Sequence, residues 1–474
     1  MKKTLNAIFI LFFALIIFYG CEDRSDLVAP PDLTPVSGDA NLSKYVAIGN
    51  SLTAGYQSSA LYQSAQQYSY PNLIAQQVGL TSFAQPLISD PGIGGQIKIV
   101  SLEPFVTKYE QSSGTPINLS YPALYGNLGI PGAVLYDVMN ATNSTDCGQA
   151  LSGGGSNPFF DIVLRNSTLN LGSQFKQAKI LHPTFITLWI GNNDVLGFAT
   201  SGGAKPTAPT PSATFAYLFS QLADSLASTG AKVVVANIPS VTAIPFFTTV
   251  GPGFGLQLKA LSVPAFYYQS GQYVPTIGTP DQLINKTILL TLISQTYLAD
   301  FGKPSGRFYR DKGIPPAAVG ADTTQPLGSQ GNPIPNALVL DAAEINIAAQ
   351  STNDFNSTIS AVASAKGWGL VNINSIFNAI RVNDATGGTD FGGISFKTTF
   401  VTGGLFSLDG VHPTAQGQAI LANEFLKVIN SKFGASYPLI DVGTIPGSLG
   451  LAKSLANKVV LPDYNYSMLK NLCF

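Results

Sequence analysis

Charged residues are scarce in this chain. Only 11% of its 474 residues are Asp, Glu, Lys or Arg, and the formal net charge is -1; about a quarter is usual for a globular domain. No cluster of basic side chains offers the electrostatic surface that nucleic acids require. We therefore expect no nucleic-acid partner, and we look for the function in a local site.

Histidine and cysteine are rarer still, with two and three residues. No spacing among them suits a metal centre, so we expect no metal. Cys147 and Cys473 either pair or remain two separate thiols, because sequence does not decide the geometry that a disulfide needs. Beyond the N-terminus, the sequence also lacks long apolar runs. A membrane-spanning helix would need about 20 apolar residues.

The N-terminus has the pattern of a secretion signal. Two lysines precede an apolar segment, residues 7–20, which is too short to cross a bilayer comfortably. Cys21 follows directly and resembles the lipidated cysteine of bacterial lipoproteins. We therefore predict a signal peptide over 1–20, a lipid anchor on Cys21 and a Pro-rich tether over 21–42. The alternative is an ordinary signal peptide with an incidental cysteine.

This pattern places the protein in the bacterial cell envelope, attached by lipid to the outer membrane, and leaves open whether the domain faces the periplasm or the exterior. The expected membrane contact is the N-terminal anchor alone. The remaining residues, 43–474, are expected to form one domain.

Short apolar runs alternate with helical patterns through this domain. The runs end at Gly, Asn or Pro, as buried parallel strands do, and lie at residues 44–49, 185–190, 232–236 and 369–373. Helical spacing follows in residues 218–226, after the capping-box pair Asp341 and Glu344, and again in residues 421–429. The alternation predicts an α/β fold with a central parallel sheet covered by helices on both faces.

Four stretches between these elements are rich in Gly, Pro, Ser, Thr and Asn: residues 81–118, 141–175, 240–335 and 383–402. We expect long, loop-like insertions there. Six aromatic residues in the third stretch suit either an apolar acyl pocket or simple packing of the insertion, which we favour: Phe246, Phe247, Phe254, Phe266, Tyr267 and Tyr268. No amphipathic helix resembling a lid is evident, so we expect short-chain esters, if esters are the substrate, to be preferred.

One of the two histidines has a carboxylate at a fixed, close spacing. Asp409 precedes His412 by three residues, which lets the carboxylate accept the imidazole Nδ1 proton and leaves Nε2 free to act as a base. His182 has no such neighbour, and we expect it to be a surface or structural residue. A nucleophile for this base is available in Ser51, at the end of the first predicted strand, although a plain helix cap would explain the same serine.

Two further turns carry hydrogen-bond donors. Gly132 lies in a tight Gly-Ile-Pro-Gly turn, and Asn193 follows the predicted strand at 185–190. Acyl transfer needs donors directed at the developing oxyanion. The backbone N–H groups of Ser51 and Gly132, with the side-chain amide of Asn193, would supply three.

These four segments, in this order, resemble the short conserved blocks of the SGNH (GDSL) hydrolase family: residues 49–52, 127–132, 191–194 and 409–412. The resemblance implies a flavodoxin-like three-layer α/β/α fold without a cofactor. It also implies Ser51 as nucleophile, His412 as base, Asp409 as its partner, and Gly132 and Asn193 as oxyanion donors. Asn50 departs from the usual Asp of the first block.

The family contains esterases, lipases and carbohydrate deacetylases. The resemblance therefore predicts a serine hydrolase that cleaves acyl or acetyl esters of a small molecule or a glycan through an acyl-enzyme. Two alternatives remain: an acyltransferase or carbohydrate O-deacetylase with the same triad, and an inactive binding lipoprotein on a hydrolase scaffold.

Overall fold

The structure, a computed structural model, describes residues 35–102, 105–205 and 208–447. The signal peptide, Cys21 and most of the predicted tether lie outside these residues, as does Cys473. The end of the tether lies within them and packs on the domain: Ala40 and Leu42 are buried, and the backbone N–H of Asp39 donates to the carbonyl of Phe433. The compact unit accordingly begins at Ser37, six residues before the predicted boundary.

A five-stranded, fully parallel sheet forms the centre of this unit, in the spatial order β4 (Asn127–Gly129), β1 (Tyr45–Gly49), β5 (Phe185–Trp189), β6 (Lys232–Ala236) and β11 (Gly369–Val371). Taken in chain order, these strands are arranged 2-1-3-4-5, the flavodoxin-like order. Four were predicted from their apolar runs, and the prediction of fold class is confirmed. Strand β4 was not predicted, because three residues are too few to show a periodic pattern.

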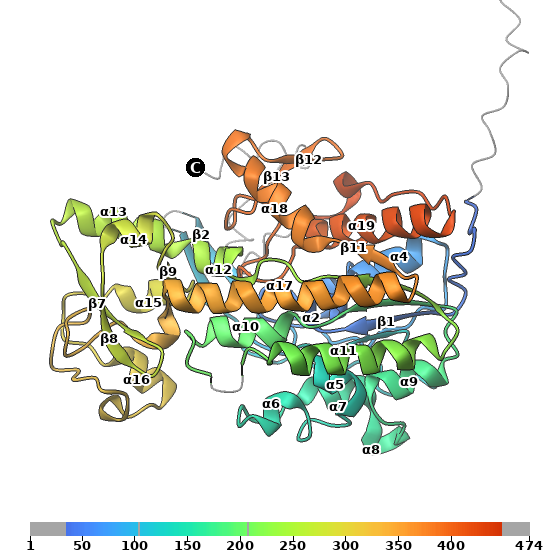
Figure 1. The fold of residues 1–474 in the computed structure, drawn as a ribbon, viewed down its shortest axis with the longest axis horizontal. Helices are drawn as coiled ribbons and strands as arrows, with labels where there is room; N and C mark the ends of the chain where they lie inside the picture. Colours follow the sequence, from blue (N-terminus) through green and yellow to red (C-terminus); the bar gives the residue numbers. More distant parts are fainter. Residues whose placement is uncertain (1–34, 103–104, 206–207, 448–474) are drawn as a thin grey trace, which may run out of the picture. The chain divides into compact units, whose positions relative to one another are not determined.

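Alternate residues of the strands pack into two hydrophobic layers. Val46 and Ile48 face one layer, whereas Tyr45 and Ala47 face the other. The first layer is covered by α5 (Leu135–Asn140), α9 (Gln174–Ile180), α11 (Ser212–Ala227) and α17 (Ala342–Ala365). The second is covered by α4 (Tyr70–Gln77), α18 (Ile373–Asn383) and α19 (Ala415–Phe433). Figure 1 shows α19 and α4 on one side of β1, and α11, α9 and α5 on the other.

The helix boundaries follow the sequence signals. Asp341 and Glu344 form the predicted capping box at the start of α17. Gly434, with φ of 65°, ends α19 in the left-handed conformation that glycine tolerates best. None of the helices in the described ranges is long and apolar enough to span a membrane.

The four Gly- and Pro-rich stretches contain more regular structure than the sequence predicted. Hairpins occur in the first and last: β2 (Ile97–Leu102) with β3 (Phe105–Tyr109), and β12 (Thr389–Phe391) with β13 (Ile394–Phe396). The second holds α6 (Gly148–Leu151), α7 (Pro158–Leu164) and α8 (Asn166–Leu169). These elements are short and depend on tertiary contacts, so local propensity gives little signal for them.

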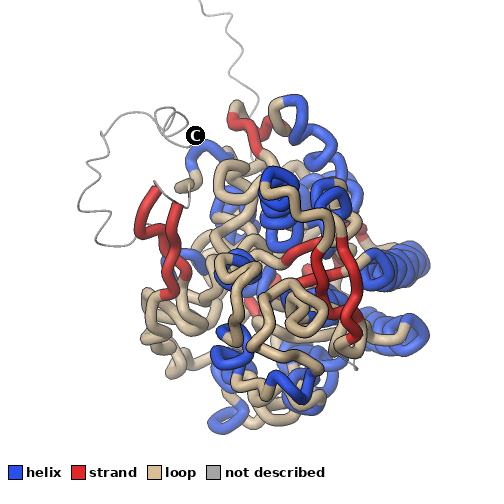
Figure 2. Tube along the Cα trace, turned by 90° about the vertical axis from the view of Figure 1, so that its left-hand side faces the viewer, coloured by secondary structure: helices blue, strands red, loops and turns tan. Residues whose placement is uncertain are grey.

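The third stretch, residues 240–335, contains a hydrophobic cluster of its own that includes Phe254, Phe266, Tyr268, Leu283 and Ile334. Its elements are α12 (Pro245–Thr248), α13 (Val250–Ala260), α14 (Pro280–Ile284), α15 (Ser294–Leu298), α16 (Arg307–Lys312), the hairpin of β7 (Phe266–Ser270) and β8 (Val274–Gly278), and β9 (Leu289–Leu290). Strand β9 pairs with β10 (Val339–Leu340) just before α17. Loops still cover most of the face seen in Figure 2.

Candidate active site

Ser51 lies at the carboxyl end of β1, where the strand order of the sheet reverses. This switch point is where open α/β sheets place their ligands. Ser51 is the first residue of the short helix α2 (Ser51–Ala54), and Asn50 caps the helix through a hydrogen bond from the Leu52 N–H to its side-chain oxygen, 3.0 Å long. A Cβ atom at Gly49 would overlap the side chain of Thr53 and the Trp189 carbonyl, so only glycine fits before this turn.

His412, which follows Ser51 by 361 residues in the sequence, connects this serine to the carboxylate of Asp409. Its Nε2 atom lies 2.9 Å from Ser51 Oγ, and its Nδ1 atom lies 2.9 Å from Asp409 Oδ2. Both distances are those of hydrogen bonds. The structure thus brings together the three side chains that the sequence proposed as a triad. His182, by contrast, is exposed.

Asp409 is buried and held by several donors. Its Oδ1 atom accepts the backbone N–H groups of Val411 (2.9 Å) and His412 (2.8 Å) and the Ser407 hydroxyl (3.2 Å), and its Oδ2 atom accepts the Ser59 N–H (2.8 Å). Burial raises the pKa of Asp409, but the charge of His412 and these hydrogen bonds outweigh it and lower the pKa to about 2. Asp409 is therefore ionised at neutral pH.

The loop that supplies the Ser59 N–H was not predicted. Ser58 and Ser59 both have positive φ, at 51° and 63°, a conformation that non-glycine residues seldom adopt. The Ser58 N–H donates to Ser407 Oγ at 2.9 Å, and Tyr56 packs its ring against the His412 imidazole with the centroids 4.8 Å apart. This loop contacts both the carboxylate and the imidazole, although Ser59 precedes Asp409 by 350 residues in the sequence.

The sequence proposed the backbone N–H groups of Ser51 and Gly132 and the side-chain amide of Asn193 as oxyanion donors. Among the hydrogen bonds of the described residues, none uses the backbone N–H of Ser51 or of Gly132. Gly132 has φ of 83°, and a Cβ there would lie 2.8 Å from Asn157 Nδ2. The Asn193 amide donates to the Ala133 carbonyl at 2.8 Å. An amide nitrogen carries two protons, so this bond fixes the side chain and leaves one proton to donate.

A buried carboxyl group, Asp194, ties these donors together. It accepts the Leu135 N–H at 2.9 Å, at the start of α5, and the Thr210 hydroxyl at 2.8 Å. Burial raises its pKa from the ordinary 3.8 to about 7, against the lowering effect of these two bonds. Because Asp194 follows Asn193 in α10 (Asn192–Thr200), it fixes α10 to the segment that carries Gly132.

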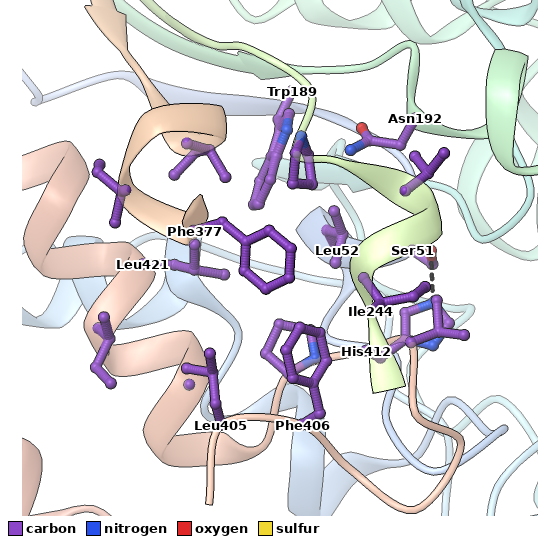
Figure 3. Close-up of a pocket in the computed structure, with 18 of the residues that line it drawn as sticks. Ser51, Leu52, Trp189, Asn192, Ile244, Phe377, Leu405, Phe406, His412 and Leu421 are labelled. Atoms are coloured by element: carbon purple, nitrogen blue, oxygen red, sulfur yellow. Dashed lines mark hydrogen bonds between the residues drawn. The ribbon is translucent and has the colours of Figure 1, made fainter. Parts of the chain in front are cut away.

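A cavity of about 890 Å³, measured with its opening to solvent, adjoins Ser51 and His412. Figure 3 shows Trp189, Phe377, Phe406 and Leu421 around it. The six aromatic residues considered for an acyl pocket are not among its described lining residues. Phe254, Phe266 and Tyr268 lie in the core of the insertion, and Phe246 and Phe247 in a small cluster beside it. Packing of the insertion accounts for these five.

The other chemically notable residues lie apart from the cavity. Cys147 is fully buried, and because Cys473 lies outside the described residues, their pairing stays an open prediction. Within the parts of the chain that the structure describes, no group of three or more His, Cys, Asp or Glu side chains is placed to hold a metal ion.

Comparison with known proteins identifies a family for most of this chain. A family model described as GDSL-like lipase/acylhydrolase matches residues 45–425. No curated protein matches the chain. A crystal structure of phospholipase A1 from Streptomyces albidoflavus NA297 is similar at 16% sequence identity, over 82% of this chain and 98% of that one, with a TM-score of 0.28.

Proposed function

The chain belongs to the GDSL-like lipase/acylhydrolase family, and from this premise we propose that it cleaves carboxylic esters through an acyl-enzyme formed on Ser51. Membership gives the general class, a serine esterase, lipase or acylhydrolase. The observation that carries the specific proposal is the hydrogen-bonded series from Ser51 Oγ through His412 to Asp409, with 2.9 Å at both contacts.

In the proposed reaction, His412 Nε2 takes the proton of Ser51 Oγ as the oxygen attacks the ester carbonyl. The N–H groups of Ser51 and Gly132 and the Asn193 amide stabilise the negative oxygen of the tetrahedral intermediate. His412 then gives its proton to the alcohol oxygen, which leaves. Water, deprotonated by His412, attacks the acyl-enzyme, and the same proton returns to Ser51 as the carboxylic acid departs. Asp409 holds the imidazole in the required tautomer throughout.

The direct test is covalent labelling of the nucleophile together with turnover. A fluorophosphonate probe should label wild-type protein at Ser51, and the protein should hydrolyse activated esters. Ser51→Ala should remove both signals. Ser357→Ala, at an exposed position on α17, is the matched control and should keep both. If wild-type protein neither reacts with the probe nor cleaves any ester or acetylated glycan, the alternative of an inactive binding protein on this scaffold is favoured.

Acyl transfer to an acceptor other than water would use the same residues. The two reactions differ in the fate of the acyl group, which hydrolysis releases as a free acid. Product analysis with added alcohols or glycans distinguishes them, and hydrolysis predicts free acid as the main product at every acceptor concentration.

We also propose that Cys21 carries a lipid that holds the protein at the bacterial outer membrane. The support is the sequence alone: a positively charged start, an apolar segment and then a cysteine. One acyl chain gives only marginal membrane binding, so stable anchoring requires more than one. Cys21→Ser should leave an active protein that no longer partitions into detergent, whereas Cys147→Ala should partition normally. Unchanged partitioning of Cys21→Ser would contradict the anchor.

A further inference from the structure

The cavity beside Ser51 is apolar along almost its whole wall. Its polar lining residues are Asn50, Ser51, Asn192, Asn193 and His412, which belong to the candidate catalytic end, and Glu424. The rest of the wall, as described, is Leu52, Trp189, Leu196, Pro239, Val241, Ile244, Ile373, Ile376, Phe377, Ile380, Leu405, Phe406, Val411, Pro413, Gly417, Ile420 and Leu421. A sugar ring bound there would leave its hydroxyl groups without partners, which is costly.

Two helices contribute rows of side chains to the cavity wall. Ile373, Ile376, Phe377 and Ile380 recur at helical spacing on one side of α18, and Gly417, Ile420, Leu421 and Glu424 do so on α19. From Gly417 to Glu424 the α19 side extends for roughly 10 Å at 1.5 Å per residue. In Figure 3, Phe377 and Leu421 lie next to each other, away from Ser51 and His412. The wall therefore continues well beyond the reacting atoms.

From this shape and lining we propose that the cavity binds the acyl chain of the substrate, and that the protein prefers esters of medium or long fatty acids to acetyl esters. The inference rests on the proposed function. We assign the acyl part of the ester to this cavity, and not the alcohol part, because Ser51 carries the acyl group in the intermediate and lines the cavity. A chain held there contributes binding energy to both acylation and deacylation.

This inference reverses the preference for short chains that the sequence led us to expect. That expectation rested on the lack of a lid-like amphipathic helix in the insertions. Part of the apolar wall instead comes from α18 and α19, two helices of the fold itself, and from Trp189 at the end of β5. The sequence pattern predicted a helix at residues 421–429, within α19, and none at α18, and helical spacing does not distinguish a cavity wall from a core.

Two isomeric esters distinguish the acyl assignment from the alternative that the alcohol chain occupies the cavity. Ethyl octanoate and octyl acetate have the same composition and similar hydrophobicity. We expect kcat/KM for ethyl octanoate to exceed those for octyl acetate and ethyl acetate by at least about tenfold, since each fully buried methylene contributes about fourfold. A preference for octyl acetate, or for ethyl acetate over both, would overturn the proposal.

Variants test whether this cavity sets the preference. Leu421 and Ile376 are only half-buried, so Leu421→Trp and Ile376→Trp should fold and shorten the cavity. Each should lower the ratio of kcat/KM for ethyl octanoate to kcat/KM for ethyl acetate by about tenfold or more. Val382→Trp, at a position on α18 that is 75% exposed, is the matched control and should behave as wild type.

Phe377→Ala should enlarge the cavity, where the tryptophan variants shorten it. It should therefore move the preferred acyl chain from octanoate toward dodecanoate. If octanoate turnover is unchanged in both tryptophan variants and in Phe377→Ala, the cavity does not hold the acyl chain. That result differs from failure of the proposed function, in which no ester is cleaved and the fluorophosphonate leaves Ser51 unlabelled.

Discussion

The side-chain amide of Asn50 donates a hydrogen bond to the side-chain oxygen of Asn192, 3.1 Å away, while its own oxygen accepts the Leu52 N–H. Asn50 is fully buried and stands where the related family usually has Asp. A carboxylate could accept from Leu52 but could not donate to the oxygen of Asn192. The amide therefore joins the serine turn to the start of α10, which carries Asn193, without burying a charge.

Replacing Asn50 by Ala should destabilise the protein because both bonds are lost. Loss of a helix N-cap costs about 1 kcal/mol, and an unpaired buried oxygen on Asn192 costs about 1–3 kcal/mol more. We expect the free energy of unfolding to fall by about 2–4 kcal/mol in urea denaturation. Asn50→Asp keeps the cap and should lose less. Equal stability of Asn50→Ala and wild type would show that the two bonds contribute nothing.

The two histidines provide a test of the proposed base. His412→Ala should reduce kcat/KM on an activated ester to near background, about as much as Ser51→Ala, because the two residues act as a unit. His182→Ala should stay close to wild type, since His182 is exposed and is not among the described lining residues of the cavity beside Ser51. Circular dichroism checks the fold of each variant. An inactive His182→Ala beside an active His412→Ala would make the assignment wrong.

Asp409→Asn should reduce turnover without unfolding the protein. The introduced amide group would face the Ser59 N–H and His412 Nδ1, where a carboxylate oxygen now accepts, and it favours the wrong imidazole tautomer. A protease triad loses roughly 10⁴-fold in such a change. We expect a smaller loss in kcat here, because backbone donors and Tyr56 also position the imidazole loop. Wild-type activity in Asp409→Asn would exclude a role for the carboxylate.

Asn193→Ala should lower kcat by roughly 10²–10³, the usual effect of removing one oxyanion donor, with little change in KM. Asn140→Ala is the matched control, because Asn140 is exposed and its amide likewise donates to a backbone carbonyl, that of Tyr136. It should leave kcat unchanged. A rise in KM at constant kcat for Asn193→Ala would instead assign Asn193 to substrate binding.

Short patterns in the sequence predicted most strands of the central sheet and the candidate triad. The apolar runs gave β1, β5, β6 and β11, and the Asp-x-x-His spacing placed Asp409 beside His412. Ser51 came from the residue types in its turn and from the order of the four blocks. Each of these signals occupies fewer than ten residues. The long insertions lie between the signals and do not interrupt them, so each signal can still be recognised.

Features that depend on distant contacts could not be predicted in this way. Ser58 and Ser59 carry no motif, and their role depends on reaching Asp409 from 350 residues away. The hydrophobic core of residues 250–340 unites short helices and hairpins that are too weakly periodic to be recognised singly. The cavity wall combines α18, α19 and the end of β5, which only the folded sheet brings together.

Asp194 provides a prediction about stability and pH. Its pKa is raised to about 7 in the folded protein, above its ordinary 3.8, because the carboxyl is buried. A raised carboxyl pKa means that ionisation opposes folding, so the contribution of Asp194 to stability falls as pH rises from about 4 to about 7. Asp137, with a pKa raised to about 6 by burial, acts in the same direction over part of this range.

Asp194→Asn should remove most of this dependence. Asparagine imitates the neutral acid, since its oxygen can accept the Leu135 N–H and its amide can donate to the Thr210 hydroxyl. The free energy of unfolding of the variant, relative to wild type, should therefore rise between pH 5 and pH 8. The shift is on the order of 1–3 kcal/mol. Asp281→Asn, at an exposed carboxyl, should show no such rise. Urea denaturation at four pH values measures the difference in free energy of unfolding between the variant and wild type. If this difference is equal at pH 5 and pH 8, Asp194 is ionised in the folded protein throughout this range.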